Sequence, residues 1–341
     1  IKDITMGNSY PDRTNASGVW KINEISKNLV TKGTWPDMSK SRCIWAGGSS
    51  PSQINTMDYV DIISTGNASD FGDLTIVKTE GQGNSSFTRA VFPGGSESNV
   101  IDYVEFATTG NASDFGDRTV ALTGVAGHSS VTRGLSAGGY TSPGDSNVID
   151  FITIASTGNS IDFGNLTSGR YTLSGCGSST RACFGGGVDI DDGDASQNII
   201  DFVQISTLGN AIDFGNLSFA KDRAGASSTA TRGFYGGGRT TSPAVAAIAS
   251  IDVISINSLG NGVDFGDLSV ARSGLSFGAI PTRIISGGGT EPGLSNIIDF
   301  FSPISMGTAT DFGNLTVARG SLSASSQGHG GLDVFDPSTR T

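Results

Sequence analysis

One tripeptide, Asp-Phe-Gly, returns six times along the 341-residue chain, each time inside a similar segment such as STGNASDFGD at residues 64–73. Its phenylalanines are Phe71, Phe115, Phe163, Phe214, Phe265 and Phe312. They are spaced by 44, 48, 51, 51 and 47 residues. A period of this length is the size of a propeller blade, a unit that needs its neighbours to bury its apolar face. The repeat therefore predicts an array of six blade-sized units.

Two further markers recur in phase with the tripeptide. An arginine opens a short apolar run that ends in Gly-Gly, as in RCIWAGG at residues 42–48, and a strand-like IDF segment or a variant of it follows. The arginines are Arg42, Arg89, Arg133, Arg181, Arg232 and Arg283, and the aspartates of the IDF segments are Asp58, Asp102, Asp150, Asp201, Asp252 and Asp299. Runs of β-branched and aromatic residues bounded by Gly, Ser and Asn are typical of strands, and no 3.6-residue apolar period appears. Each unit is predicted to hold four strands: a (before the arginine), b (ending in Gly-Gly), c (IDF) and d (Asp-Phe-Gly).

The number of strands predicts how the array closes. Strands b, c and d occur six times from Arg42 onward, whereas strand a precedes only the second to sixth units. A sixth copy of strand a follows the last unit, in RGSLSASSQ at residues 319–327. If this C-terminal strand completes the first blade, every blade has four strands and the ring leaves no open sheet edge. The prediction is an all-β, six-bladed β-propeller over residues 42–327.

The repeated tripeptide is interpreted as structural. In a protein kinase Asp-Phe-Gly holds magnesium, but the chain lacks the accompanying catalytic loop, since neither His128 nor His329 is followed by Arg-Asp. We expect the phenylalanine to fill the space between blades, the glycine to supply a special backbone angle and the aspartate to tie a turn. Copper-ligand sets and a Ser-His-Asp triad are also poorly supported by two histidines, so we expect no enzymatic activity.

The repeated arginines and aspartates suggest a second structural device. With one of each per unit, we predict a ladder of arginine–carboxylate pairs within or between blades, because the planar guanidinium suits a carboxylate partner. The alternative is a ring of arginines around the channel that captures an anion. The surplus of acidic residues, 32 against 21 basic ones, favours the ladder.

Composition and charge exclude several partners. The net charge of −11 argues against nucleic acid, whose binding needs clustered Lys and Arg. No apolar run approaches the roughly 20 residues of a membrane-spanning helix, so membrane insertion is not expected. Three cysteines are too few for a disulfide framework. Cys176 and Cys183 flank a predicted tight turn, and two buried thiols are favoured there over a disulfide.

Loop lengths distinguish the two faces of the predicted ring. The b–c loops hold 9, 6, 10, 13, 13 and 9 residues, whereas the a–b and c–d turns are short and nearly constant. The b–c loops share one face, the loop face, with the d–a connections, and the short turns share the opposite turn face. Variable loops on a rigid scaffold commonly carry recognition. The predicted ligand-binding residues are Tyr140, Asp145, Asp189, Asp191, Asp192, Asp194, Arg239 and Thr240.

One of these loops, VDIDDGDASQN at residues 188–198, is rich in carboxylates. Oxygen ligands of this kind suit Ca²⁺. The four aspartates that could bind it are Asp189, Asp191, Asp192 and Asp194. The loop matches no full calcium-binding signature and lacks the distal glutamate of an EF-hand. A solvated acidic loop is therefore the favoured interpretation, with Ca²⁺ as the alternative.

Segments outside the repeats are predicted to serve as attachment points. In residues 1–41, a short helix would place Trp20, Ile22, Ile25 and Leu29 on one apolar face. That face would dock on the ring or on another subunit, which would make the protein a homo-oligomer. Residues 328–341 form a C-terminal tail that contains a strand-like LDVF segment.

The repeat pattern resembles the kelch repeat. A strand b ending in Gly-Gly, an apolar strand c, and an aromatic and a basic residue near strand d occur together in RGFYGGG, IDVISI and DFGDLSVAR. The chain departs from kelch in having phenylalanine where strand d usually has tryptophan. The segments NVIDY and TTGNASDFGD resemble segments in repeat proteins of marine tailed phages. Residues 17–36 resemble a segment that leads into such repeats in phage virion proteins.

This resemblance implies an extracellular, virion-bound protein of a tail or head appendage. It implies binding of a host-surface glycan or protein through the loop face, and contacts to other virion proteins through residues 1–41 and 328–341. A purely structural docking ring of the virion is the alternative. A polysaccharide-degrading enzyme that uses the loop-face aspartates is a third.

Overall fold

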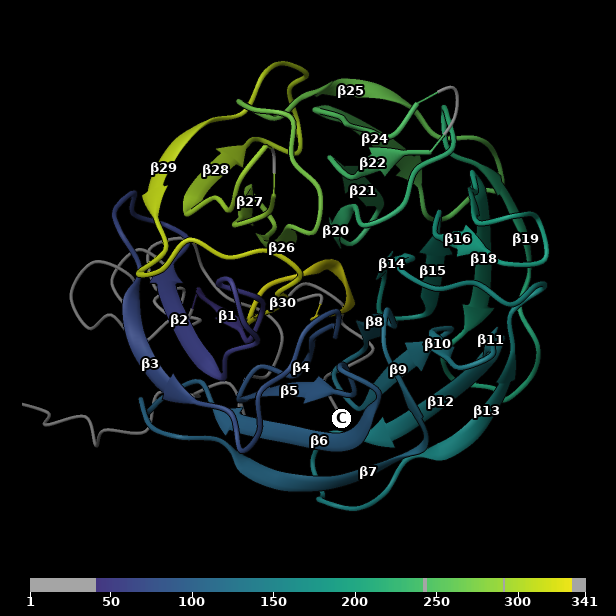
Figure 1. The fold of residues 1–341 in the computed structure, drawn as a ribbon, viewed down its shortest axis with the longest axis horizontal. Helices are drawn as coiled ribbons and strands as arrows, with labels where there is room; N and C mark the ends of the chain where they lie inside the picture. The colour runs from purple at the N-terminus through teal and green to yellow at the C-terminus, as the bar shows by residue number, and fades with distance from the viewer. Residues whose placement is uncertain (1–40, 242–243, 291, 333–341) are drawn as a thin grey trace, which may run out of the picture. The chain divides into compact units, whose positions relative to one another are not determined.

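A computed structural model describes residues 41–332 except 242–243 and 291. It contains six four-stranded antiparallel sheets arranged in a ring, which confirms the predicted six-bladed propeller (Figure 1). The predicted N-terminal helix lies outside the described residues, as does most of the tail. Within the described part of the chain, no helix is long and apolar enough to cross a membrane.

Strands within each blade run from the axis outward in the order a, b, c, d. Blade one contains β30 (Ser323–Ser326), β1 (Arg42–Ala46), β2 (Thr56–Asp61) and β3 (Ser69–Asp73). Blade two contains β4 (Asn84–Ser85), β5 (Arg89–Pro93), β6 (Ser98–Glu105) and β7 (Ser113–Leu122). Blade three contains β8 (Ala126–Ser129), β9 (Arg133–Ala137), β12 (Val148–Thr153) and β13 (Ile161–Asn165).

The other three blades repeat this order. Blade four contains β14 (Ser174–Gly177), β15 (Arg181–Gly185), β18 (Ile199–Gln204) and β19 (Ile212–Asn216). Blade five contains β20 (Gly225–Ser228), β21 (Arg232–Gly236), β24 (Ser250–Ser255) and β25 (Val263–Asp267). Blade six contains β26 (Ser276–Ile280), β27 (Arg283–Gly287), β28 (Ile297–Phe301) and β29 (Thr310–Asn314). A short 3₁₀ helix, η1 (Gly330–Leu332), follows β30.

The C-terminal strand β30 closes the ring, as predicted from the strand count. It pairs antiparallel with β1 and places Ala324 opposite Trp45. Trp45 is fully buried, and its indole Nε1–H donates to the carbonyl of Ser276 in blade six, 3.2 Å away. Strand β30 thus covers the edge of β1, while Trp45 connects the first blade to the last.

The phenylalanines of the repeated tripeptide fill the space between blades, as expected. All six are buried, and five pack edge-on against the aromatic residue of strand c in the same blade, as Phe71 does against Tyr59 at 5.6 Å. The glycine of the motif has a positive φ, 139° at Gly72, and a side chain there would collide with the carbonyl of Gly110 in the next blade. Only glycine allows this close approach of two backbones.

The predicted arginine–aspartate ladder is wrong in its basic partners. Each buried IDF aspartate instead pairs with a Lys or Arg of the preceding blade. This residue follows strand d in five blades and lies within strand d, β7, in blade two. Each aspartate also accepts a hydrogen bond from a nearby Thr or Ser hydroxyl. The pairs are Arg319–Asp58, Lys78–Asp102, Arg118–Asp150, Arg170–Asp201, Lys221–Asp252 and Arg272–Asp299. The hydroxyls belong to Thr316, Thr75, Thr119, Thr167, Ser218 and Ser269, in the same order.

The strand-b arginines have a different role. Their register explains why they miss the aspartates, since Arg42 lies opposite Asp61 and Asp58 lies opposite Trp45, three residues further along β1. Each of the six arginines donates instead to a backbone carbonyl just after strand c of the next blade, as Arg133 does to Ile205 at 2.7 Å. Five also stack over the aromatic residue of strand c. They tie neighbouring blades together, and each already has carbonyl partners, so the anion-ring alternative has no support.

The two facing cysteines are buried and free. Cys176 and Cys183 are opposite residues on β14 and β15, so the predicted tight hairpin is present. Burial raises the pKa of the Cys176 thiol to about 12, which keeps it protonated and unreactive. The interpretation as two buried thiols fits this geometry.

Candidate functional site

Three extra hairpins rise from the loop face over blades three, four and five. They are β10 (Tyr140–Thr141) with β11 (Gly144–Asp145), β16 (Val188–Asp189) with β17 (Ala195–Ser196), and β22 (Arg239–Thr240) with β23 (Ala246–Ala247). Isolated bridges join each hairpin to the d–a connection of the preceding blade, as Tyr140 does with Thr123. The b–c loops and the d–a connections therefore share one face, and all eight predicted ligand-binding residues lie on it.

The hairpins of blades three and four contact each other through predicted residues. Asp145 accepts a hydrogen bond from the backbone N–H of Ile190 at 3.0 Å, which links the two loops. The ring of Tyr140 lies 5.5 Å from that of Tyr171, tilted by 46°. Tyr171 belongs to the d–a connection beneath the hairpin of blade four, where it bridges to Val188. The two tyrosines form an aromatic surface between neighbouring hairpins.

The acidic loop is shaped by its own hydrogen bonds. Asp189 accepts from the N–H of Asp191, Asp192 accepts from the amide of Gln197, and Asp194 has a left-handed φ of 61°. Among the described residues, no three carboxylate, histidine or cysteine side chains converge in a way that could hold a metal ion. The calcium alternative therefore has no geometric support, whereas the solvated acidic loop fits.

A buried carboxylate that sequence reasoning missed positions Arg239. Asp222 is fully buried and accepts from Arg239 Nε at 2.9 Å and from Ser196 Oγ at 2.7 Å. The guanidinium of Arg239 is 31% exposed, and among the described residues its two terminal amino groups have no partner. A buried, hydrogen-bonded carboxylate thus holds the Nε edge of the guanidinium, and the terminal amino groups are donors that could bind a ligand.

The charges around Tyr171 perturb its hydroxyl. Burial raises the pKa of Tyr171, and the negative charge of Asp194 raises it further, while Arg223 opposes these effects. The phenol therefore stays protonated at neutral pH and acts as a hydrogen-bond donor. Tyr140, Tyr171, Asp194 and Arg239 together form what we call the loop-face site.

A ring of six backbone hydrogen bonds surrounds the axis next to this site. Each d–a connection contributes one residue with a positive φ between 53° and 67°, and its N–H donates to the equivalent residue of the preceding blade at 2.7–2.9 Å. The six residues are Glu80, Gly124, Thr172, Arg223, Gly274 and Ser321. Glu80 and Arg223 are three steps apart in either direction, so their 2.9 Å ion pair spans the ring. This pair covers the loop-face end of the central channel.

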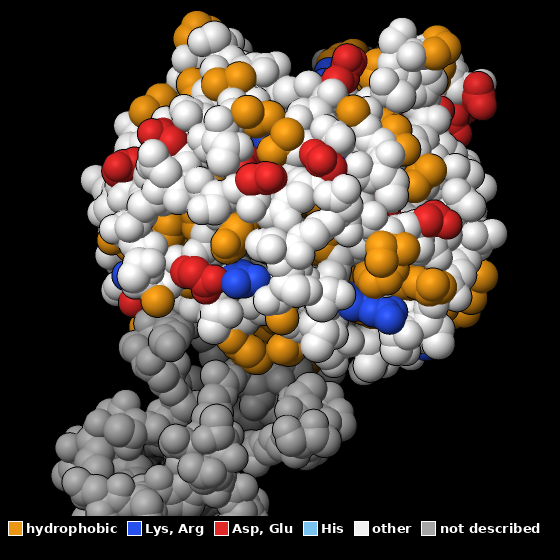
Figure 2. All heavy atoms as spheres, turned by 90° about the horizontal axis from the view of Figure 1, so that it is seen from below, with side chains coloured by type: hydrophobic (Ala, Val, Ile, Leu, Met, Phe, Trp, Pro, Cys, Tyr) orange, Lys and Arg blue, Asp and Glu red, His pale blue; other side chains and the backbone are white. Residues whose placement is uncertain are grey.

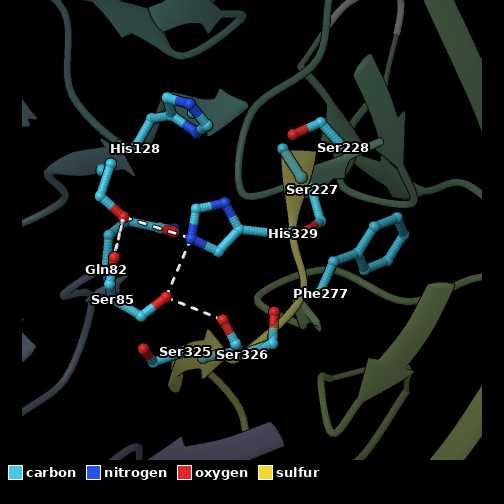
Figure 3. A pocket seen from close by; sticks show the side chains of 15 residues that line it. Gln82, Ser85, His128, Ser227, Ser228, Phe277, Ser325, Ser326 and His329 are labelled. Carbon is cyan, nitrogen blue, oxygen red and sulfur yellow. Dashed lines mark hydrogen bonds between the residues drawn. The ribbon is translucent and has the colours of Figure 1, made fainter. Parts of the chain in front are cut away.

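The other end of the channel is occupied by the chain itself. After β30, His329 enters between the a strands, and its Nε2 lies 2.9 Å from Ser85 Oγ and 3.2 Å from Ser129 Oγ (Figure 3). A cavity of about 30 Å³ remains in the channel. It is lined mainly by Gly and Ser, with both histidines. Residues 328–332, predicted to belong to a separate tail, therefore pack inside the ring, and Leu332 lies in η1 rather than in a strand.

The Ser–His contacts in the channel do not form a catalytic dyad. Ser85 and Ser129 each donate their hydroxyl proton to a backbone carbonyl, so both accept from His329. The His329 Nδ1 accepts from the N–H of Gly331 at 3.1 Å, which leaves the ring proton on Nε2. A nitrogen that carries a proton cannot take one from a serine, so this histidine is not placed as a general base.

Comparisons with known proteins add no family to this description. No protein-family model matches the chain, and no curated protein matches it at a significant level.

Proposed function

We propose that this propeller is a non-enzymatic binding protein displayed on a tailed-phage particle, and that its loop face binds a host-surface glycan or protein. The observation that carries the binding role is the loop-face site, in which a buried aspartate orients an exposed arginine next to two tyrosines. The phage assignment rests on the sequence resemblance alone.

The chemistry of the loop-face site favours a sugar ligand. Binding sites combine aromatic surfaces with a few oriented polar groups. Here the Tyr140–Tyr171 surface offers apolar contact, the free edge of Arg239 offers donors, and Asp194 offers an acceptor. Neutral sugar rings have apolar faces and hydroxyl groups that match all three. The nearby carboxylates and the net charge of −11 disfavour a strongly anionic ligand.

The enzyme alternative has weaker support. Both histidines of the chain lie inside the ring, where His128 is buried and His329 is half-buried, so the loop face offers carboxylates but no imidazole. A polysaccharide-degrading activity would therefore have to use the aspartates of the acidic loop. Turnover of host polysaccharide that is lost in Asp194→Asn would support this alternative and contradict the non-enzymatic proposal.

Receptor binding predicts a measurable effect of Arg239. In an adsorption assay, the isolated chain should compete with phage for the host surface, and Arg239→Ala should compete about 10-fold less well, because a hydrogen bond to a charged group contributes roughly 1.5–3 kcal/mol. A matched control is Asp162→Asn, an exposed change on β13 of the outer rim, which should compete as the wild type does. If the wild-type chain does not block adsorption, or if Arg239→Ala blocks it equally well, the loop-face site is not the receptor site.

A second candidate function, a docking ring, is favoured by an uneven distribution of apolar side chains on the outer rim. The c–d turn of each blade donates a backbone hydrogen bond to strand d of the preceding blade, as Gly209 does to Phe163. At three consecutive junctions the residues flanking this bond are exposed and apolar, whereas at the other three they are Ser or Thr. The apolar pairs, which we call the apolar half-rim, are Ile161 with Leu208, Ile212 with Leu259, and Val263 with Met306. The polar pairs are Ser113 with Thr157, Ser69 with Thr109, and Thr310 with Thr65.

The apolar half-rim is proposed as the surface that contacts another virion protein. Each of the six side chains is 57–68% exposed. Basic residues are few on the side of the molecule drawn in Figure 2, where acidic and hydrophobic side chains lie scattered over a mostly uncharged polar surface. Contiguous exposed apolar groups on a soluble protein commonly mark an interaction surface. The half-rim lies on the turn-face side, so docking there would leave the loop face accessible.

A triple substitution tests this surface with residues that the chain already uses at equivalent positions. Leu208→Thr, Leu259→Thr and Met306→Thr together should change the free energy of unfolding by only about 0.5 kcal/mol per site, because the side chains are exposed. The variant should be incorporated into phage particles less efficiently, as measured by the amount of the chain per particle. Wild-type incorporation of a stably folded variant would contradict the docking role.

A further inference from the structure

The turn-face end of the channel is closed by residues 328–332, which enter it as a narrow backbone segment. Gly330 and Gly331 lie so close to the carbonyls of Thr229 and Ser129 that neither position has room for a Cβ atom. Between blade six and this segment, a groove of about 390 Å³ is lined by Arg232, Pro281, Pro303, Ile304 and Leu332, among others. The segment thus packs through backbone contacts at its two glycines, and His329 supplies the side-chain hydrogen bonds.

The hydrogen bonds of His329 are compatible with one protonation state only. Nε2–H donates to the hydroxyls of Ser85 and Ser129, and Nδ1 accepts from the N–H of Gly331 within the same segment. A second proton on Nδ1 would place two donors against each other and break the bond that folds η1 back onto the histidine. Protonation thus removes one of the two hydrogen bonds by which η1 contacts His329, and leaves the bond from the Leu332 N–H to the His329 carbonyl.

Charged groups around His329 would not compensate for its protonation. The described residues that line the channel include no Asp, Glu, Lys or Arg, and the ring of His128 lies 5.5 Å away (Figure 3). The charged residue lining the groove on the other side of His329 is Arg232. His128 donates from Nε2 to the carbonyl of Ser178 at 3.0 Å. A protonated His329 would therefore face a second imidazole and a guanidinium, and no described carboxylate.

We propose that His329 is a pH-sensitive latch, which holds residues 328–332 in the channel while the imidazole is neutral and releases them when it is protonated. Release opens the turn-face end of the channel and exposes the serine-lined a strands. The Glu80–Arg223 pair lies at the opposite end of the channel, so release of residues 328–332 opens the turn-face end.

The direction of the pH dependence follows from burial. Burial lowers the pKa of His329 well below its ordinary value, and the nearby His128 lowers it further. Burial also lowers the pKa of His128, to about 4. An unfolded or released histidine titrates at about 6.5, so the released state binds more protons as the pH falls below roughly 6.5. Closure is complete above pH 6.5, and each pH unit below that value favours release by up to about tenfold.

The full chain offers a direct test because it contains two histidines. The ring-proton NMR signals of the two can be assigned with His329→Gln and His128→Gln, since glutamine keeps an N–H donor near the position of Nε2 but does not titrate. Amide hydrogen exchange of residues 330–332, corrected for intrinsic rates, should accelerate by at least tenfold between pH 7 and pH 4.5. In His329→Gln this pH dependence should disappear, while His128→Gln should retain most of it.

Two results would overturn the latch. One is a wild-type protein in which exchange at residues 330–332 does not change with pH, or in which His329 titrates near 6.5 while the segment stays protected. The other is a pH response that persists in His329→Gln and is lost in His128→Gln, which would identify His128 as the trigger. Thermal unfolding at pH 7 shows whether each variant is folded, and the wild-type measurement decides the proposal without any variant.

Discussion

Replacing Arg170 with methionine is expected to lower the free energy of unfolding by about 3–5 kcal/mol, because it leaves the buried carboxylate of Asp201 without its cation. Both side chains are fully buried, and Arg170 Nη2 lies 2.6 Å from Asp201 Oδ2. Arg170 Nη1 also donates to the carbonyls of Gly186 and Ile199, so the substitution removes these two hydrogen bonds as well. Urea unfolding at neutral pH measures the change.

The chain supplies matched controls for this prediction. Blades one and four have lysine, Lys78 and Lys221, at the position that Arg170 occupies in blade three, so Arg170→Lys should cost clearly less than Arg170→Met. The exposed Arg89–Glu105 pair has a similar contact distance of 2.7 Å, yet Glu105→Gln should cost only about 0.2–1 kcal/mol, because water screens the charges. Adding Asp201→Leu to Arg170→Met should recover much of the loss. A loss below 1 kcal/mol in Arg170→Met would show that the buried pairs do not hold the blades together.

Removing the closing strand is expected to abolish cooperative folding of the ring. A chain that ends at Gly320 lacks β30, so β1 loses its antiparallel partner from Cys43 to Ala46. These β1 residues are buried in the closed ring, and their exposure on an open edge favours association with other chains. The loss is comparable with the whole net stability of a domain, roughly 5–15 kcal/mol. Light scattering and urea unfolding should show aggregation and a broad transition.

Two further experiments serve as controls for this truncation. A chain that ends at Leu332 keeps all the contacts of β30 and η1, so it should unfold at the same urea concentration as the full chain. A synthetic peptide of residues 321–332 added to the shorter chain should restore a monomeric, cooperative species. If the chain ending at Gly320 is itself monomeric and unfolds like the full chain, β30 is not needed for closure.

Much of the fold could be predicted because the repeat gives both the number of blades and the position of each strand within a blade. Strands b, c and d occur six times, and the sixth strand a follows the last unit. The ring closes if this strand completes the first blade, as β30 does. The short turns and the variable loops also fall on opposite faces as expected. These features depend on local motifs. The glycine of Asp-Phe-Gly, for example, is required because two backbones meet there at every junction around the ring.

The pairing of charges could not be predicted because phase alone does not distinguish residues that recur once per blade. Arg42 and Arg319 both recur in phase with Asp58, and only the register of β1 and β2 shows that Arg319 reaches the carboxylate. The true set contains two lysines and four arginines, which hid it among the other basic residues. The loop-face site could be predicted only in part. Its hairpin residues stand out as insertions, whereas Asp222 occupies a position that other blades fill with different residues.

The sequence by itself determined the six blades, the closing strand and the face that carries variable loops, because each depends on local patterns repeated at a constant spacing. Only the tertiary structure decided which basic residue neutralises each buried aspartate, that Glu80 and Arg223 meet across the ring, and that His329 enters the channel. These contacts join residues from different blades, or the tail and the ring. Their distances are set by the closed circle of sheets, which no single repeat contains.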